Sequence, residues 1–114
     1  MRLFVILAVI AGQATAQETV ERPSGFLSGN NLFSSCQTNE TMNSLCTSYI
    51  MGAIDMSVMA GGNILGWESC IPRGVSPEQT KDVVILWIEN NPQHRHFAGA
   101  YLVQRAVRDA FPCD

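Results

Sequence analysis

Four cysteines are the residues of this sequence whose chemistry is easiest to foresee. The chain has 114 residues, and its cysteines are Cys36, Cys46, Cys70 and Cys113. An even number of cysteines in a small exported domain is typical of disulfides. No two of them have C-x-x-C spacing, and the intervals fit no common zinc pattern. We therefore expect two disulfides and no metal. Three pairings are possible in principle, and we favour Cys36–Cys46 with Cys70–Cys113.

Two histidines and one isolated carboxylate are the other candidates for chemistry. His94 and His96 are two positions apart, so they share no helix face and make a poor metal-binding pair. Asp55 is the only charged residue between Glu40 and Glu68, and we expect a partly buried, hydrogen-bonded carboxylate. A hydrolase using His96 and Asp55 is the weakest hypothesis, because no serine elbow, phosphate loop or H-E-x-x-H motif is present. We expect no catalytic residues and no cofactor.

Residues 74–113 must position the second pair of cysteines, and they predict two helices joined by a tight corner. Ser76 is suited to cap the first helix, and Pro92 is suited to begin the second. Because helices with a short link are expected to pack antiparallel, Cys70 and Cys113 would meet at one end. Apolar residues at helical spacing should bury one stripe of each helix: Val83, Val84, Trp87 and Ile88, then Gly99, Leu102, Val103, Ala106, Val107 and Ala110.

A second long helix is predicted from Thr41 to about Ala60, after a short helix from Asn31 to Cys36. Gly52 weakens the long helix by about 1 kcal/mol relative to alanine, so we expect another backbone to approach it closely. Two apolar stripes make this helix apolar over much of its circumference, as in a central helix: Leu45, Tyr49, Ala53 and Met56, with Ile50, Ile54 and Val58. The predicted fold class is all-α: a small helical domain of about four main helices with two disulfides.

The segment 61–68 interrupts the helical pattern with three glycines, yet it carries Ile64, Leu65 and Trp67. Such side chains either fold back over the core or dock into a partner. Tryptophan buries a large area and is enriched among binding hot spots. We therefore predict that these three side chains form part of a partner-binding surface, with burial against the core as the alternative.

The first residues have the pattern of a signal peptide. Arg2 is followed by an apolar run and by the small-x-small site Ala14-Thr15-Ala16. We predict a signal peptide at 1–16, a single domain at 17–114, and no stable membrane insertion after cleavage. Seven basic residues against ten acidic ones give a net charge of −3, which argues against nucleic-acid binding.

The order of short motifs along the chain is similar to that of a known family. The motifs are Phe26-Leu27-Ser28-Gly29-Asn30, Cys36, Cys46, Tyr49-Ile50-Met51-Gly52, Asp55, Cys70-Ile71-Pro72, Gly74-Val75-Ser76, Asp82-Val83-Val84, Asn91-Pro92, Arg95-His96, Ala100, Leu102-Val103, Ala106 and Phe111-Pro112-Cys113. Together they resemble the Rap/Tai immunity family, exported helical proteins associated with type VI secretion amidase effectors. The resemblance covers nearly all of the chain after the predicted signal peptide.

The resemblance implies a small, all-helical, disulfide-containing domain that is often a homodimer. It further implies a periplasmic inhibitor, not an enzyme, that binds a peptidoglycan amidase effector and occludes its active site. The family has no catalytic residues to transfer to this chain. The alternative function is a periplasmic stress-related binding module or chaperone without a toxin partner.

Overall fold

The computed structural model describes residue 12 and residues 25–64 and 66–114. Except for residue 12, the predicted signal peptide lies outside the described residues. The described chain forms four α-helices, α1 (Gly29–Ser35), α2 (Glu40–Met59), α3 (Pro77–Asn90) and α4 (Gly99–Ala110). It also forms a hairpin of β1 (Asn63–Ile64) and β2 (Trp67–Glu68) and a 3₁₀ turn, η1 (Pro92–His94). The prediction of a small all-α domain is confirmed.

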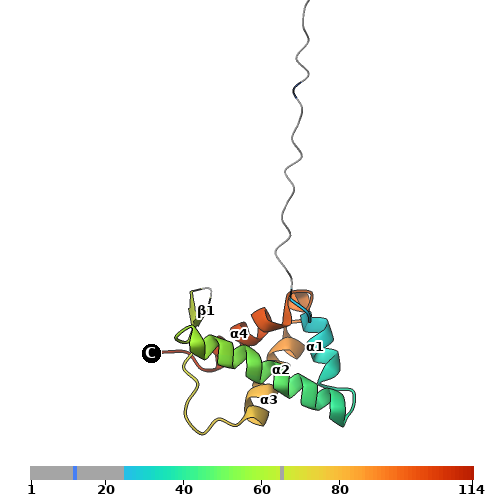
Figure 1. The fold of residues 1–114 in the computed structure, drawn as a ribbon, viewed down its shortest axis with the longest axis horizontal. Helices are drawn as coiled ribbons and strands as arrows, with labels where there is room; N and C mark the ends of the chain where they lie inside the picture. Colours follow the sequence, from blue (N-terminus) through green and yellow to red (C-terminus); the bar gives the residue numbers. More distant parts are fainter. Residues whose placement is uncertain (1–11, 13–24, 65) are drawn as a thin grey trace, which may run out of the picture.

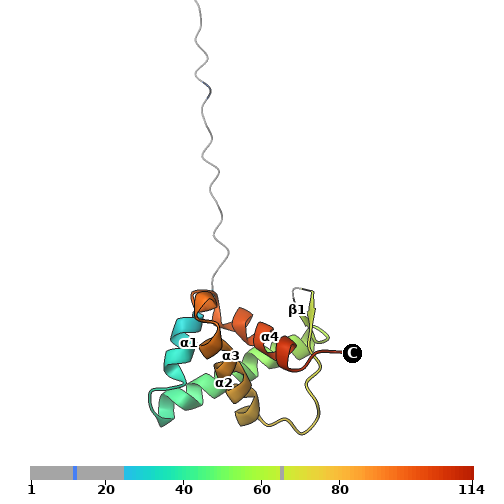
Figure 2. The same ribbon diagram turned by 180° about the vertical axis from the view of Figure 1, so that it is seen from behind.

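The long helix α2 crosses the front of the molecule, with α1 at one end and the hairpin at the other (Figure 1). The view from behind shows α3 and α4 on the other side of α2 (Figure 2). All four helices contribute to one core, whose most deeply buried side chains are Leu32, Cys46, Ile50, Val84, Ile88, Leu102, Val103 and Val107. None of the helices in the described part of the chain is long and apolar enough to cross a bilayer.

The helix starts follow from local hydrogen-bonding chemistry. Ser76 caps α3 as predicted, since its hydroxyl accepts a hydrogen bond from the Gln79 backbone N–H at 3.1 Å. A capping box that we did not predict starts α1. The Ser28 hydroxyl accepts from the Asn31 N–H at 3.2 Å, and Asn31 Oδ1 accepts from the Ser28 N–H at 3.3 Å. As a result α1 begins two residues before the predicted start.

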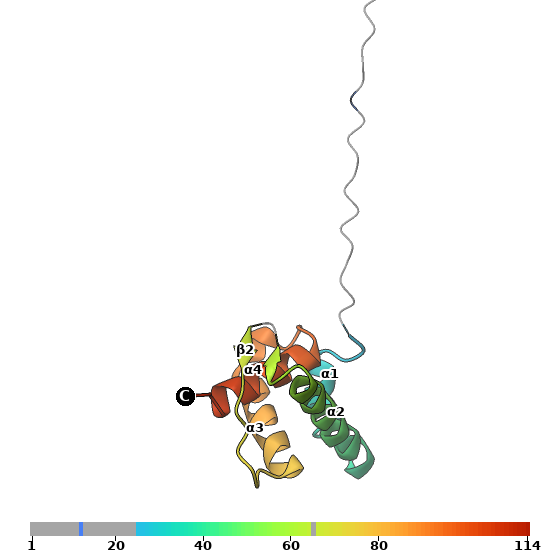
Figure 3. The same ribbon diagram turned by 60° about the vertical axis from the view of Figure 1, so that its left-hand side comes forward.

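The corner between α3 and α4 differs from the prediction. Residues 92–94 form only the 3₁₀ turn, and α4 begins at Gly99 instead of Pro92. The helices cross and do not lie antiparallel along each other (Figure 3). Trp87, near the end of α3, donates from Nε1 to Oδ2 of Asp109, near the end of α4, at 3.0 Å. An antiparallel pair with a short link would instead place the end of α3 beside the start of α4.

Bonds to the beginning of the fold explain why the chain turns in this way. The Gly29 N–H donates to the Phe97 carbonyl at 2.8 Å, and the Gly99 N–H donates to the Leu27 carbonyl at 2.7 Å. The fit is close at Gly29, where an added Cβ would overlap the Leu102 side chain and lie 2.7 Å from the Arg95 carbonyl oxygen. Residues 95–99 are therefore held against the start of α1.

Both predicted disulfides are present, Cys36–Cys46 and Cys70–Cys113. The first is buried between α1 and α2, whereas Cys70 is exposed and Cys113 is half-buried. The pairing is as predicted, but an antiparallel hairpin is not what brings the second pair together. Instead, the Cys70 N–H donates to the carbonyl of Phe111, just after α4, at 2.8 Å.

The environment of α2 was predicted wrongly. Cys46, Ile50 and Ser57 are its buried residues, but Leu45 is 57% exposed and Met56 is 60% exposed. The predicted close approach of another backbone to Gly52 is also absent within the described chain, because an added Cβ there would meet nothing within 4 Å. One side of this apolar helix therefore faces solvent. The prediction for Ala110 at the end of α4, expected in the buried stripe, is wrong as well, since it is exposed.

Candidate partner-binding surface

The segment 61–68, predicted to be an irregular loop, is a short hairpin in the structure. Asn63 pairs with Glu68 and Ile64 pairs with Trp67 in antiparallel register. Glycine is required at its turns, because Gly61, Gly62 and Gly66 have φ values of 74°, 77° and 79°. The hairpin projects beyond the end of α2 (Figure 1).

The base of the hairpin is fixed by backbone hydrogen bonds and by one disulfide. The Gly62 N–H donates to the Ser57 carbonyl at 2.8 Å, and the Ser69 N–H donates to the Gly62 carbonyl at 3.2 Å. Cys70 follows directly and is bonded to Cys113. The hairpin is thus anchored to α2 on one side and to the end of α4 on the other.

A cleft of about 280 Å³ lies at the base of the hairpin. Buried Val107 and Ser57 contribute to its wall. The full lining is Ile54, Ser57, Val58, Gly61, Gly62, Ser69, Cys70, Ile71 and Val107. Concave, mainly apolar surfaces with a few polar groups are typical of binding sites. The protruding hairpin and this cleft together form the candidate surface.

The three side chains predicted to bind a partner are described to different degrees. Ile64 is half-buried and its backbone lies in β1. The backbone of Trp67 lies in β2, directly across from Ile64, but its side chain lies outside what the structure describes, as does all of Leu65. The choice between docking into a partner and folding over the core therefore stays a prediction.

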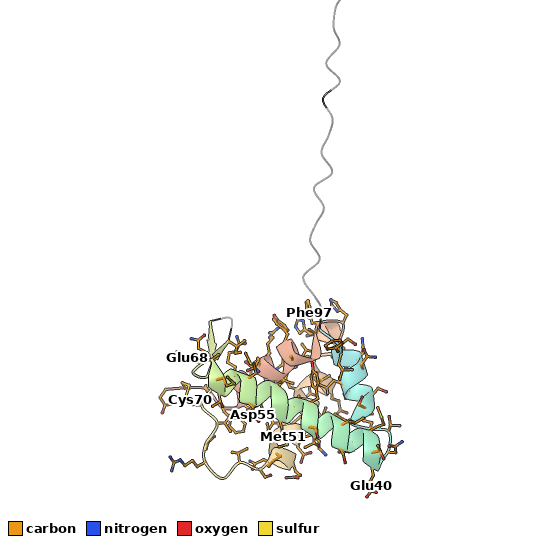
Figure 4. The ribbon with its side chains drawn as sticks, in the orientation of Figure 1. Glu40, Met51, Asp55, Glu68, Cys70 and Phe97 are labelled. Atoms are coloured by element: carbon orange, nitrogen blue, oxygen red, sulfur yellow. A yellow bond between two sulfur atoms is a disulfide. The ribbon has the colours of Figure 1, made fainter. Side chains whose placement is uncertain are left out.

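The other predicted chemical groups lie elsewhere. Asp55 is exposed, so the expectation of a partly buried carboxylate is wrong: α2 turns Cys46, Ile50 and Ser57 toward the core and this position toward solvent. Asp55 and Met51 lie on one edge of α2, apart from Phe97 (Figure 4). The His96 ring lies 4.4 Å from the Phe97 ring, so the fold does not bring His96 to Asp55.

The two histidines belong to a row of neighbouring aromatic rings at the corner, some stacked and some tilted. His94 is half-buried and stacks on Trp87 at 6.0 Å and on Phe97 at 5.7 Å. Phe97 in turn lies 5.5 Å from Tyr101. Across residue 12 and ranges 25–64 and 66–114, no three His, Cys, Asp or Glu side chains are grouped so that they could hold a metal ion.

Two polar residues matter more for the architecture than the sequence indicated. Arg95 donates from Nε to the Ile88 carbonyl and from Nη2 to the Glu89 carbonyl, both at 3.0 Å, and its guanidinium lies 4.3 Å from the centre of the Phe33 ring. Buried Gln104 donates from Nε2 to the Ala53 carbonyl at 2.9 Å. Arg95 lies seven positions after Ile88, just past the end of α3. This spacing is the one local signal in the sequence that could have suggested the hydrogen bonds of Arg95 to α3.

The structure shows a small helical domain with two disulfides, and family comparison gives the class. The model for the Rap1a immunity proteins matches residues 28–113, which is most of the chain. The chain belongs to the Rap1a immunity protein family, as the resemblance in the sequence indicated. A comparison with curated proteins found no match.

Family membership gives the coarse function. It suggests an immunity protein for a secreted effector, with that effector as its binding partner, and an inhibitor in place of an enzyme. The two disulfides fit a protein of an oxidising, extracytoplasmic compartment.

Proposed function

We propose that this protein is a periplasmic immunity protein that binds a peptidoglycan amidase effector of a type VI secretion system and occludes its active site. The observation that carries the proposal is the family match over residues 28–113 on a fold with a protruding, anchored hairpin. The disulfides and the signal-peptide pattern at 1–16 support the periplasm as the place of action. The resemblance also supports a homodimer.

The proposed inhibition is steric. The hairpin enters the substrate cleft of the amidase, where Ile64, Leu65 and Trp67 exchange water for apolar contacts. A buried tryptophan side chain removes about 150–250 Å² from water, which is enough for a hot spot. Anchorage at both ends of the hairpin supports this role, since less conformational entropy is lost on binding when a segment is already ordered.

The function is tested by capture and inhibition. The mature protein is used to capture partners from a periplasmic extract, and each captured protein is assayed for hydrolysis of peptidoglycan with and without added immunity protein. The expected result is a captured amidase that loses activity at stoichiometric inhibitor. Capture of diverse unfolded proteins, together with suppression of their aggregation, would instead favour the chaperone alternative.

The hairpin is tested by Trp67→Ala. If Trp67 docks into the amidase, binding should weaken by about 2 kcal/mol or more while the melting temperature stays nearly unchanged. Phe26→Ala is the matched control, because Phe26 is an exposed aromatic residue that lies outside the hairpin, before the start of α1. If Trp67 packs on the core instead, the variant should lose about 3–5 kcal/mol of stability and, once folded, bind normally.

A further inference from the structure

The two disulfides differ in how closely solvent approaches them. Cys46 is 1% exposed and Cys36 is 8% exposed, and both belong to the core that the four helices share. Cys70, in contrast, is exposed, and Cys113 is half-buried. Cys70 lies beside the hairpin, near Glu68 and at the edge of the molecule (Figure 4). A dissolved thiol can therefore approach the second disulfide in the folded protein, whereas burial shields the first.

Access to the sulfur atoms is one of the conditions for thiol–disulfide exchange, and exposed disulfides are the labile or regulatory ones. Sequence separation does not reverse this order. The separations are 43 positions for Cys70–Cys113 and 10 for Cys36–Cys46, and they act through the entropy of the unfolded chain. Reduction within the folded protein does not involve that state. Burial therefore sets which of the two disulfides opens first.

The packing of the core does not include the second disulfide. The fully buried large side chains all lie on the four helices. Cys70 lies between β2 and α3, and Cys113 follows the end of α4, so both are outside the helices. Cys46, in contrast, lies within α2 and is itself one of the fully buried residues. Opening Cys70–Cys113 therefore removes no side chain from the core.

The second disulfide does hold the base of the hairpin. The Ser69 N–H donates to the Gly62 carbonyl at 3.2 Å, which closes the base, and the next residue is Cys70. The Cys70 N–H donates to the Phe111 carbonyl at 2.8 Å, close to Cys113. With the disulfide open, this is the one backbone hydrogen bond from segment 69–70 to segment 111–113 in the described part of the chain. Water competes for such a bond at an exposed position, so the base would be held less firmly.

We propose that Cys70–Cys113 is a redox switch, which a dithiol reductant opens while Cys36–Cys46 stays closed. A thiolate of the reductant attacks the sulfur of the more exposed Cys70 and forms a mixed disulfide with it. Cys113 leaves as a thiolate and takes up a proton that the reductant has released. The second thiol of the reductant then attacks the mixed disulfide and releases the Cys70 thiol. Two electrons pass to the protein, and the reductant becomes a disulfide.

The open form keeps its core and loses the covalent anchor of its hairpin. A segment that is less ordered before binding loses more conformational entropy on binding. If the hairpin docks into the effector, the open form therefore binds the effector more weakly than the closed form does. This last step rests on the function proposed above, whereas the selective opening of one disulfide does not.

Selective opening is tested on the mature, oxidised protein with an excess of dithiothreitol. Samples are quenched by alkylation at intervals, and peptide mapping measures the modification of each cysteine. Cys70 and Cys113 should be alkylated together, at least about tenfold faster than Cys36 and Cys46. The control is the same reaction in urea that unfolds the chain. There the ratio should fall below about threefold, because burial no longer protects either disulfide.

Two results of this experiment would overturn the proposal. One is reduction of both disulfides at equal rates in the folded protein, or faster reduction of Cys36–Cys46. The other is loss of the helical circular-dichroism signal in step with alkylation of Cys70. In that case reduction would unfold the whole domain, and the disulfide would be a structural link and no switch.

Release of the hairpin base is measured on the permanently open variant Cys70→Ser/Cys113→Ser. Backbone order parameters from NMR should fall from about 0.85 to below about 0.6 at Gly62 and Ser69, and should stay near about 0.85 at Ile50. Wild-type protein with only this disulfide reduced should give the same values, which separates loss of the bond from any effect of serine. Unchanged order at Gly62 and Ser69 would overturn the switch, because opening would then have no structural effect.

The effect on the effector is tested last, with an amidase captured as described above. The oxidised protein should inhibit that amidase at a concentration at least about tenfold lower than the open variant requires. Equal inhibition by the two forms would overturn the link between the switch and binding. Failure of the oxidised protein to inhibit any amidase would count against the proposed function alone, because the alkylation and NMR measurements use no effector.

Discussion

The two ends of α2 are held in place in different ways. At the α1 end, the Cys36–Cys46 disulfide is buried, and backbone bonds join residues 27–30 to residues 95–99. At the hairpin end, Cys70 is exposed, and the Cys70–Cys113 disulfide joins the base of the hairpin to the end of α4. Packing and hydrogen bonds surround the first disulfide, whereas the second directly follows a hairpin with three glycines at positive φ.

This difference shows where the fold can vary without losing its core. Regions with few buried apolar contacts open at lower free energy than the core does, and binding surfaces are often found there. At the hairpin end, the covalent link adds to the backbone hydrogen bonds that hold the base of the hairpin. The α1 end keeps its shape through many contacts. The stability lost when one of them is removed should therefore depend on which contact it is.

The largest effect should come from removing Cys70–Cys113. The two cysteines are 43 positions apart, against 10 for Cys36–Cys46, and loop-closure entropy predicts losses of about 4 and about 3 kcal/mol respectively. Urea unfolding of the two double alanine variants measures both values. A greater loss for Cys36–Cys46 would show that packing of its two buried sulfurs outweighs the loop term, which would sharpen the contrast between the ends.

The next effect tests the packing of the α1 end. Leu102 is fully buried and contacts Gly29, so Leu102→Ala should cost about 3 kcal/mol through lost burial and a residual cavity. Leu86→Ala is the matched control, because Leu86 is 58% exposed and should cost roughly 0.5 kcal/mol. Equal losses in thermal unfolding would contradict the assignment of the core.

A smaller effect is expected from the arginine at the corner. Arg95→Lys keeps the charge but cannot donate to the Ile88 and Glu89 carbonyls at once, so it should lose about 2 kcal/mol. Arg73→Lys, in an exposed part of the loop before α3, should be neutral. Chemical denaturation of the two variants decides the matter; a neutral Arg95→Lys would mean that water replaces the lost bonds.

The smallest effect compares two helix caps. Ser28→Ala and Ser76→Ala should each cost about 1 kcal/mol, because each removes the acceptor for an N–H at the start of a helix. Native-state hydrogen exchange should distinguish them: Ser28→Ala should speed exchange in α1 alone, and Ser76→Ala in the first turn of α3. Uniform acceleration by both would indicate that the two ends unfold as one unit.

Local chemistry explains what was predictable from the sequence. The cap of α3, the end of that helix and its buried Val84 and Ile88 all follow from residues within one or two turns of each other. Both disulfide pairings were also predicted. The corner was not, because the bonds between residues 97 and 99 and the start of α1 join parts of the chain that no local pattern connects.

The environment of α2 was mispredicted for a related reason. Two neighbouring apolar stripes do not indicate which of them packs against the core. A glycine within a helix suggests that another backbone lies close to it, but the fold places none near Gly52 within the described residues. Of the candidate site, the sequence located the segment 61–68 from its glycines but missed the pairing of Ile64 with Trp67. Pairing over two residues per strand is too short for an alternating pattern to be visible.

The connectivity of the two disulfides bears on how the chain acquires them. The cysteines are paired in sequence order, the first with the second and the third with the fourth. During stepwise appearance of the chain in an oxidising compartment, Cys36 and Cys46 are the first two thiols to emerge and can join at once. Only one other thiol, that of Cys113, then remains to pair with Cys70. An oxidant that links thiols in order of their emergence therefore produces the native connectivity directly, without isomerase-catalysed reshuffling.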